Sequence, residues 1–459
     1  ADLLTHTAGF DRRILGRMTR DSSKLGSLGG YLARRMPPVV REPGTLSVYS
    51  NHGFALAGYL LEAITGTPFA RAMEERIFEP LEMRRTSFAL RPELEGALAT
   101  GYGWQGKQGP PLPRAYVRTV PASMLRTTAA DLVRWMQAIL AGGLLDSVRI
   151  LPADRARKLL RRQRGNHPYL PGRSYGMSEG RRFEPPSVIH SGGVPGFTSA
   201  LLLHEELSLG IVVLLNSQAP PWDIVRGILE RYDGAVPHRS PPPFLDDPVP
   251  TARLAGYYRN AEVPHRGPAR IGALVEQVRV RAPEPGRVVW NGRSYRAVDS
   301  LAFRREGGDG IVAFAEAGGE VRYAARSGGE YERVSWFRSR PVQAGLWTGF
   351  LVLFLGGTVA GGVRLFRRRR PAATDSGGRP SPPHWPTLAS AGAAALDLLF
   401  VGLLAFGLSR VMGDAVLLDF GLPAWLSATF LLPPVAGALA LPAAWGAVRS
   451  WREGWSGPL

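Results

Sequence analysis

The sequence predicts mixed α and β structure (α/β, of the α+β kind) with an antiparallel sheet flanked by helices, then a small all-β domain and about three transmembrane helices. Three observations predict this order. Helical periodicity alternates with apolar strands over residues 1–235, short strand-like runs fill residues 251–340, and long apolar stretches lie within residues 341–459. A chain of 459 residues is long enough for several such domains.

Two helices are expected early in the first domain. From His52 to Thr65 the spacing places four apolar residues on one helical face, and Gly66 is a natural C-cap. Thr67 and Pro68 then restart a helix as N-cap and first residue. The residues expected to face inward are Phe54, Ala57, Leu61 and Ile64 in the first helix, and Phe69, Met73 and Ile77 in the second.

The later part of this domain predicts a capped helix and a hairpin. Thr128 to Asp131 has the pattern of a capping box before an apolar helical run. The runs F-T-S-A-L-L-L-H and G-I-V-V-L-L-N, separated by a short polar turn, predict two buried strands, and a last helix is expected at 222–231. An antiparallel sheet flanked by helices follows.

A Pro-rich linker at 236–250 separates this domain from the small β domain at 251–340. Runs such as V-E-Q-V-R-V-R, R-V-V-W and E-V-R-Y alternate with Gly- and Pro-containing turns. Closely spaced short strands of this kind predict an antiparallel barrel or sandwich. None of its residues suggests catalysis, so a spacer or a wall beside the substrate is the expected role.

Three apolar stretches in residues 341–459 are long enough to cross a bilayer, at about 342–363, 388–409 and 420–448. The third contains four prolines, so we expect it to be kinked or partly re-entrant. Arginines follow the first and third stretches, at Arg364, Arg367–Arg370, Arg449 and Arg452. Positively charged loops stay in the cytoplasm. The expected localisation is a multi-pass protein of the cell membrane, with its large domains outside the cytoplasm and the lipid bilayer as a partner.

Charge and composition exclude several classes of function. The net charge is +18, but the arginines are scattered along the chain, so we expect no nucleic-acid partner. Cysteine is absent, and the histidines show no ligand spacing, so neither a metal site nor a cofactor is expected. Asp397 lies within the second apolar stretch, where we interpret it as a packed or snorkelling residue and not a proton relay.

Four motifs occur in order in the first half of the chain: L-L-T-H-T-A-G-F at 3–10, P-G-T-L-S-V-Y-S-N-H-G-F at 43–54, I-F-E-P-L-E-M at 77–83 and I-H-S-G-G-V-P-G-F at 189–197. Together they resemble the serine β-lactamase superfamily, in particular the class C β-lactamase-related hydrolases and penicillin-binding relatives. The resemblance implies a β-lactamase/transpeptidase-like fold. The segment L-A-G-Y-Y-R-N at 254–260 also resembles the β domain often appended in this family.

The resemblance implies catalytic roles for five residues. Tyr49 would shuttle a proton beside the nucleophile, and Asn51 would donate to a substrate carbonyl. His190 stands where a lysine is more familiar, followed in the same motif by Gly192, and the amide of Gly193 would supply half of an oxyanion hole. Each motif alone is also an ordinary turn or N-cap. His6 is expected to be structural, shaping a loop.

The nucleophile motif of this family, Ser-x-x-Lys, does not occur in the sequence. The three lysines follow Asp21, Trp104 and Arg155 at that spacing. We therefore expect the sequence to be an N-terminally truncated fragment, inactive as it stands, because Tyr49 lacks the cation that would activate a phenol. The run G-M-S-E-G at 176–180 satisfies G-x-S-x-G, but no apolar strand precedes it and no helix follows, so it is rejected as a nucleophile elbow.

The expected function is that of an extracytoplasmic, membrane-anchored serine hydrolase acting through an acyl-enzyme. Its substrates would be D-amino-acid peptides, including peptidoglycan-derived ones, β-lactams or small esters. The alternative is a non-catalytic protein that binds or senses cell-wall ligands in the same cleft. A third hypothesis makes the three apolar stretches part of a transporter, but three spans without a repeat argue against it.

Overall fold

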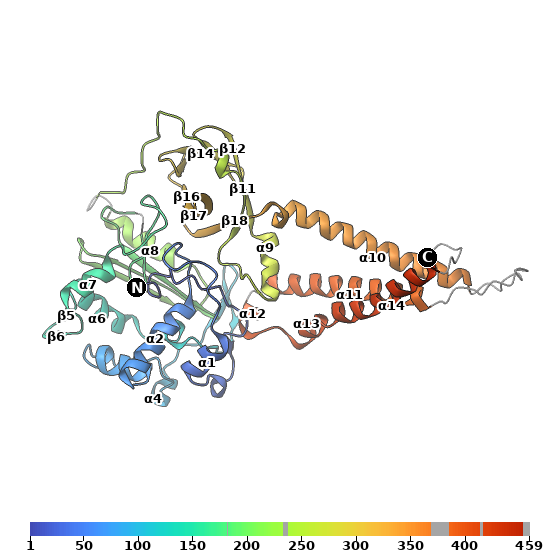
Figure 1. The fold of residues 1–459 in the computed structure, drawn as a ribbon. Coiled ribbons are helices and arrows are strands. Elements are labelled where there is room, and N and C mark those ends of the chain that lie inside the picture. Colours follow the sequence, from blue (N-terminus) through green and yellow to red (C-terminus); the bar gives the residue numbers. More distant parts are fainter. Residues whose placement is uncertain (181, 233–236, 369–384, 414–415, 453–459) are drawn as a thin grey trace, which may run out of the picture. The chain divides into compact units, whose positions relative to one another are not determined.

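The computed structural model describes residues 1–180, 182–232, 237–368, 385–413 and 416–452. The chain divides into two compact units, Ala1–Ser339 and Arg340–Leu459. The first unit contains a mixed α/β part and a β-barrel, and the second contains long apolar helices (Figure 1). The predicted boundary at residues 235 and 236 lies outside the described residues.

A four-stranded antiparallel sheet forms the centre of the mixed part, in the order β10-β9-β8-β7. Its strands are β7 (Ser178–Glu179), β8 (Val188–Val194), β9 (Phe197–His204) and β10 (Leu209–Leu215). Alternate residues of β9 face opposite sides. Leu202 packs in a cluster with α8 (Pro221–Leu229), whereas Leu203 packs in a cluster with α6 (Ala129–Leu140). Helices therefore cover both faces, as the apolar hairpin pattern predicts.

The remaining elements of this part surround that sheet. The other helices are α1 (Leu28–Arg35), α2 (Asn51–Thr65), α3 (Phe69–Met73), α4 (Pro92–Glu95), α5 (Val120–Ser123) and α7 (Ala153–Leu160). Short turns of 3-10 helix lie at Ser22–Lys24 and Glu230–Tyr232, and one π-helical turn lies at Glu74–Phe78. Three small two-stranded sheets pair β1 (Met18–Thr19) with β4 (Tyr116–Val117), β2 (Tyr102–Trp104) with β3 (Gln108–Pro111), and β5 (Leu144–Leu145) with β6 (Val148–Arg149).

The buried face of α2 differs from the predicted one. Ala55 and Gly58 are buried, whereas Ile64 is 82% exposed. A Cβ on Gly58 would lie 2.4 Å from Cγ of Pro121, in α5. The backbones of α2 and α5 therefore approach closely through small residues. For this reason the buried face of α2 contains Ala55 and Gly58 and not the larger apolar residues that the helical periodicity predicts.

Two further local predictions need correction. Thr128 caps α6 by accepting from the backbone N–H of Asp131, but the Asp131 carboxylate does not complete a capping box. It accepts instead from the N–H of Arg85 and the hydroxyl of Thr86. In the restarted helix the N-cap is Pro68 and not Thr67.

The segment at 251–340 forms a closed eight-stranded antiparallel barrel, one of the two forms expected for it. Its strands are β11 (Gly256–Asn260), β12 (Gln277–Glu284), β13 (Arg287–Trp290), β14 (Arg293–Ala297), β15 (Ala302–Arg305), β16 (Ile311–Ala317), β17 (Glu320–Arg326) and β18 (Gly329–Val334), with a short helix α9 (Gly272–Val275). The rings of Tyr258, Trp290, Phe303 and Phe314 are buried inside. Because the barrel belongs to the first compact unit, its status as a separate domain stays a prediction.

The described residues of the second unit form five helices: α10 (Arg340–Arg368), α11 (Trp385–Gly413), α12 (Val416–Phe420), α13 (Ala424–Thr429) and α14 (Leu432–Arg452). In the part of the chain that the structure describes, three segments are long and apolar enough to span a bilayer, at 340–363, 385–411 and 424–446. The third is interrupted between α13 and α14 and contains Pro442 within α14, as its prolines predict. Arg369 and Arg370 of the predicted basic loop lie outside the described residues.

Candidate active site

Tyr49, Ser50 and Asn51 stand at the start of α2. Ser50 is the N-cap, and its hydroxyl accepts a hydrogen bond from the N–H of Gly53 at 3.2 Å. The turn is therefore an ordinary helix start, and the same turn presents Tyr49 and Asn51 to a large cleft. The helix cap and a role in the cleft are compatible, because Ser50 caps the helix while Tyr49 and Asn51 line the cleft.

His6 supports this turn from an adjacent loop. Its Nδ1 accepts a hydrogen bond from the N–H of Ser50 at 3.1 Å, so this nitrogen carries no proton. Its ring centroid lies 4.5 Å from that of Tyr49 and 5.1 Å from that of Phe54. Burial, assisted by the positive charge of Arg173, lowers the pKa of His6 to about 3. A neutral, buried imidazole in this position agrees with the structural role expected for it.

The second candidate motif lies on β8. His190 is opposite Leu201 and Gly192 opposite Ser199 on β9. On the other edge, β7 pairs only with Val188 and Ile189. From His190 onward, no strand within the described residues covers this edge, so backbone groups there are available to a ligand.

The glycines of this motif keep the strand open. A Cβ on Gly192 would lie 2.2 Å from the hydroxyl oxygen of Ser199, whereas a Cβ on Gly193 would meet nothing within 4 Å. The hydroxyl of Ser191 accepts a hydrogen bond from the indole N–H of Trp222 at 2.9 Å. Gly192 is thus required for packing, and Gly193 leaves space for a ligand beside the backbone.

The two motifs, more than a hundred residues apart in the chain, line one cleft of about 1490 Å³. All five residues assigned by resemblance lie in its wall: Tyr49, Asn51, His190, Gly192 and Gly193. Apolar side chains of other elements complete the wall, among them Met73, Ile77, Phe88, Trp135 and Leu201. The cleft therefore combines a few polar groups with a large apolar surface, as ligand sites commonly do.

Arginine dominates the charge of the cleft. Seven arginines line it, and within the described part of the chain the lining contains neither Asp nor Glu. The arginines are Arg12, Arg13, Arg17, Arg85, Arg114, Arg126 and Arg173. A concave wall with one sign of charge attracts ligands of the opposite sign.

Arg173 is the functional candidate that the sequence analysis missed. Burial raises the pKa of Tyr49, and the Arg173 guanidinium is the strongest of the charges that oppose this rise. His190 is open to solvent through the cleft mouth, yet the surrounding protein and the Arg173 charge lower its pKa. Both side chains are therefore neutral near pH 7. No sequence signal distinguishes Arg173 from the many other arginines.

The described residues do not provide an obvious nucleophile in the cleft. Ser50 is occupied as a helix cap, and Ser191 accepts from Trp222. Ser178, the serine of the rejected G-x-S-x-G run, accepts from Arg173 and lies in the two-residue strand β7. Chemically, the arrangement can position an acyl substrate and transfer a proton through Tyr49, given a nucleophile.

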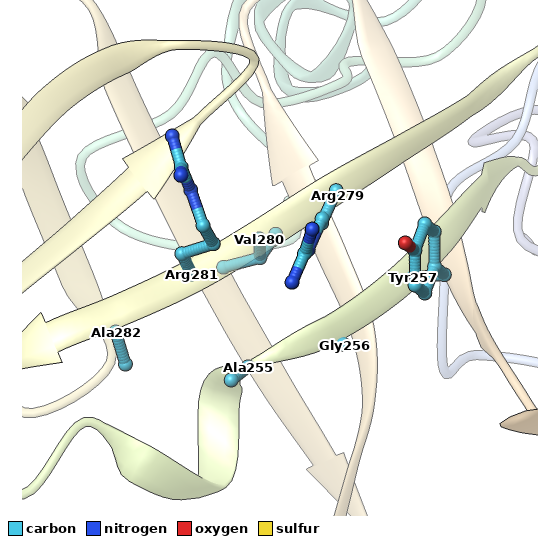
Figure 2. Close-up of a pocket in the computed structure, with 7 residues that line it drawn as sticks. All are labelled: Ala255, Gly256, Tyr257, Arg279, Val280, Arg281 and Ala282. Carbon is cyan, nitrogen blue, oxygen red and sulfur yellow. The ribbon is translucent and has the colours of Figure 1, made fainter. Parts of the chain in front are cut away.

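Neither a second hollow on the barrel nor a metal site offers a better functional candidate than the cleft. A hollow of about 380 Å³ lies between β11 and β12 on the barrel, where Arg279 stands 5.9 Å from the ring of Tyr257 (Figure 2). Its wall is open and holds no buried polar side chain. Among the described residues, no group of three or more His, Asp or Glu side chains could hold a metal ion.

Comparison with known proteins places these motifs in context. The family model "Beta-lactamase" matches residues 1–232. The human protein "Putative beta-lactamase-like 1" is 31% identical over an alignment of 240 residues, and the match covers 49% of this chain and 45% of that protein. Protein flp of Staphylococcus aureus (strain MW2) is 26% identical over 195 residues, covering 39% of this chain and 36% of flp. The chain thus spans less than half the length of these relatives.

A solved structure shows similarity over a longer part of the chain. The crystal structure of SurE covers 72% of this chain and 78% of its own, with a TM-score of 0.51 and 22% sequence identity. At this identity the likeness concerns the fold alone. Its coverage exceeds the 232 residues of the family match.

Proposed function

Because the chain belongs to the Beta-lactamase family, whose model matches residues 1–232, we propose that it functions as a membrane-anchored, extracytoplasmic serine hydrolase. The observation that supports this proposal is that two motifs distant in the sequence line the same cleft. Tyr49 and Asn51 from the start of α2, and His190, Gly192 and Gly193 from β8, line one cleft. These are the positions at which the family resemblance puts a proton carrier, an amide donor and an oxyanion hole.

In the proposed reaction, a serine hydroxyl attacks the carbonyl carbon of an amide, ester or lactam. As a neutral phenol, Tyr49 would relay protons: it accepts the serine proton while its own phenolic proton passes to the leaving group, and the amide N–H of Gly193 would supply half of the oxyanion hole. The amide of Asn51 donates to the substrate. Water then attacks the acyl-enzyme, its proton returns to the serine oxygen through the same base, and the free acid leaves.

We propose that the nucleophilic serine and its lysine belong to a segment N-terminal to Ala1. Two features of the structure support this. The cleft, at about 1490 Å³, exceeds the few hundred to 1,000 Å³ common for small-molecule sites. In addition, β10 ends the described sheet with one unpaired edge, which can accept a further strand.

The charge of the cleft favours some substrates over others. Seven arginines in its wall suit an acyl substrate that carries a carboxylate, because guanidinium groups bind carboxylates through paired hydrogen bonds. D-amino-acid peptides, including peptidoglycan-derived ones, and β-lactams have such a group. Small neutral esters do not, so we place them third.

The proposed membrane anchor rests on the second compact unit. Its three long apolar segments contain 24, 27 and 23 residues, each enough to span a hydrocarbon core. The arginines that follow the first and third segments favour a cytoplasmic position for those ends. This orientation puts the cleft outside the cytoplasm, where cell-wall peptides occur.

The test begins with the coding DNA upstream of Ala1. We expect an in-frame Ser-x-x-Lys motif, and incubation of the complete protein with a β-lactam or an activated ester should add the acyl mass to that serine. Replacing the proton carrier by Tyr49→Phe should lower kcat/KM about 10²- to 10⁴-fold. Tyr59→Phe, at an exposed tyrosine within α2, is the matched control.

The competing function is ligand binding without turnover in the same cleft. An upstream sequence without Ser-x-x-Lys, together with no acyl adduct, would reject the hydrolase proposal. Saturable binding of a D-alanyl peptide to the complete protein, weakened by substitution of Asn51 or His190, would then favour the binding protein.

A further inference from the structure

Arg173 lines the cleft, and its backbone is hydrogen-bonded on both sides. Its backbone N–H donates to the carbonyl of Arg164 at 2.7 Å, and its own carbonyl accepts from the N–H of Gln163 at 2.8 Å. It also forms isolated β-bridges with Arg164 and with Ser178. The side chain is 22% exposed, so the guanidinium is largely surrounded by protein.

Two groups fix the guanidinium from behind. Nη1 donates to the hydroxyl of Ser178, and Nη2 lies 3.9 Å from Oε1 of Glu330. Glu330 belongs to β18 of the barrel, and its side chain is only 12% exposed. A carboxylate in such a position is costly to bury unless a cation or hydrogen bonds accompany it.

Glu330 is also connected to the turn that carries Tyr49. The amide nitrogen of Asn166 lies 3.5 Å from Oε1 of Glu330, and the amide oxygen of Asn166 accepts from the N–H of Ser47 at 2.9 Å. Ser47 is two residues before Tyr49. Leu46 and Val48 pack in one cluster with Ala261, which follows β11, and with Tyr323 of β17. The barrel therefore supports both the cation and the backbone of the site.

We propose that Arg173 is the cation that polarises Tyr49 and His190 in the cleft, and that Glu330 of the barrel is its positioning residue. The inference rests on the proposed function, because Tyr49 matters as a proton carrier only in a hydrolase. It assigns the barrel a role in the active site instead of that of a spacer. It also adds Arg173 as a second cation of the cleft that Tyr49 lines, besides the lysine of Ser-x-x-Lys.

The charges around these two groups agree with the assignment. Arg173 contributes most to the positive field at Tyr49, followed by Arg17 and Arg12, all opposing the rise in pKa that burial causes. At His190, Arg173 is the charge that lowers the pKa together with burial. His6 is close enough to His190 for its own pKa to respond to it.

The experiment titrates Tyr49 and His190 by NMR in the full chain in detergent micelles, with ¹³C-labelled tyrosine Cζ and histidine Cε1. Signals are assigned with the Tyr49→Phe and His190→Asn variants. We expect Arg173→Gln to raise both pKa values, because it removes a positive charge that favours the deprotonated phenol and the neutral imidazole. Arg173→Lys should restore part of the shift. Arg114→Gln removes another cleft arginine, one paired with Glu95, and should change neither value.

Glu330→Gln separates positioning from simple charge removal. If Glu330 holds Arg173 towards the cleft, its loss lets the cation move away, and both pKa values rise in the same direction as in Arg173→Gln. If Glu330 only adds a negative charge, both values fall, and the positioning role is overturned. Unchanged titrations in Arg173→Gln would overturn the whole inference.

These measurements need no nucleophile, so they are independent of turnover. Shifts of the expected sign in a complete protein that forms no acyl adduct would reject the proposed hydrolase while leaving the Arg173–Glu330 pair established as a feature of the cleft. In an active complete protein, Arg173→Gln should displace the alkaline limb of the kcat/KM profile to higher pH. An unchanged limb would reject the role in catalysis.

Discussion

His6 and His52 are the two buried imidazoles beside the first motif, and they are neutral for different local reasons. His6 accepts from the N–H of Ser50, whereas Nε2 of His52 lies 3.1 Å from the hydroxyl of Tyr31. Burial lowers the pKa of His6 to about 3 and that of His52 to about 4. Protonating either imidazole places a positive charge in a buried site, which costs free energy.

Acid should therefore destabilise this region in a predictable window. Because the folded pKa values lie below 6.5, the unfolded chain binds more protons. The stability from each imidazole is complete above about pH 6.5 and is lost as pH falls towards 4 for His52 and 3 for His6, by up to about 1.4 kcal/mol per pH unit. Urea unfolding from pH 7 to 4 measures this slope.

The variant His6→Asn isolates one of the two contributions. Asparagine tolerates the positive φ of 58° at this position and can still accept a hydrogen bond. We expect the variant to show a shallower loss of stability between pH 6.5 and 4 than the original chain. Equal slopes would mean that His6 is not a neutral buried group.

The motifs identified candidate site residues from sequence, but their surroundings were not predictable in the same way. Tyr49, Asn51 and His190 occur in short patterns whose order is specific. Arg173, in contrast, gains its role from Glu330, which is 157 positions later in the chain. A contact over that separation leaves no local pattern, so only the fold can reveal it.

At the scale of elements, α2 and α5 pack through small side chains. A Cβ on Gly58 would lie 2.4 Å from Cγ and 2.7 Å from Cβ of Pro121. Separations under 3 Å force one element to move, and proline is too rigid to yield easily. This contact explains why helical periodicity predicted the wrong buried face of α2. Periodicity points to the bulky apolar residues, whereas a close contact with α5 requires small residues such as Ala55 and Gly58.

We predict that Gly58→Ala destabilises the protein by about 1–3 kcal/mol, because overpacking exceeds the gain of up to about 1 kcal/mol in helix propensity. Gly227→Ala in α8 is the matched control, since nothing lies within 4 Å of the new Cβ; it should be neutral or stabilising by up to about 1 kcal/mol. Urea midpoints of the two variants decide the matter. A stabilised Gly58→Ala variant would contradict the packing argument.

The β9–β10 hairpin shows where sequence reasoning works well at this scale. Its register runs from Leu209 opposite His204 to Leu215 opposite Thr198, and apolar residues dominate both strands. A continuous apolar run bounded by a polar turn has few alternatives. The π-helical turn at Glu74–Phe78 has no such signature. Within it Phe78 is buried, and Ile77, predicted to face inward, is partly buried against the same core cluster.

At the scale of the whole molecule, the apolar helices of the second unit indicate that the chain is held in a lipid bilayer. Each of its three apolar segments is exposed over most of its surface, with 6–17% of its most apolar window buried. We expect the chain to remain in membranes after alkaline carbonate extraction, and a variant ending at Ser339 to be released. Release of the full chain would contradict the membrane assignment.

The mixed part and the barrel are joined by a buried ionic cluster around Glu332. Its carboxylate accepts from Arg41 of the mixed part, from Arg259 of β11 and from His265, whose Nε2 lies 3.2 Å away. The Nδ1 of His265 in turn lies 2.9 Å from Oδ1 of Asp11. The sequence predicts a linker between these two parts and contains no local signal for this contact, because the residues of the cluster lie in four distant segments.

Glu332 should therefore be a major contributor to the stability of the first unit. Despite burial, its hydrogen bond to His265 and the two arginines lower its pKa to about 2, so its stabilisation is present above about pH 4.5 and lost as pH falls towards 2. Removing one partner of a buried pair costs about 3–5 kcal/mol. We expect Glu332→Gln to lower the unfolding free energy by about that amount at pH 7 and to flatten its decline between pH 4.5 and 2.

The control is Glu75→Gln, which breaks the exposed pair with Arg71 and should change the unfolding free energy by less than about 1 kcal/mol. Urea unfolding of the three proteins tests this, and equal losses in both variants would show that the cluster adds no more than a surface ion pair.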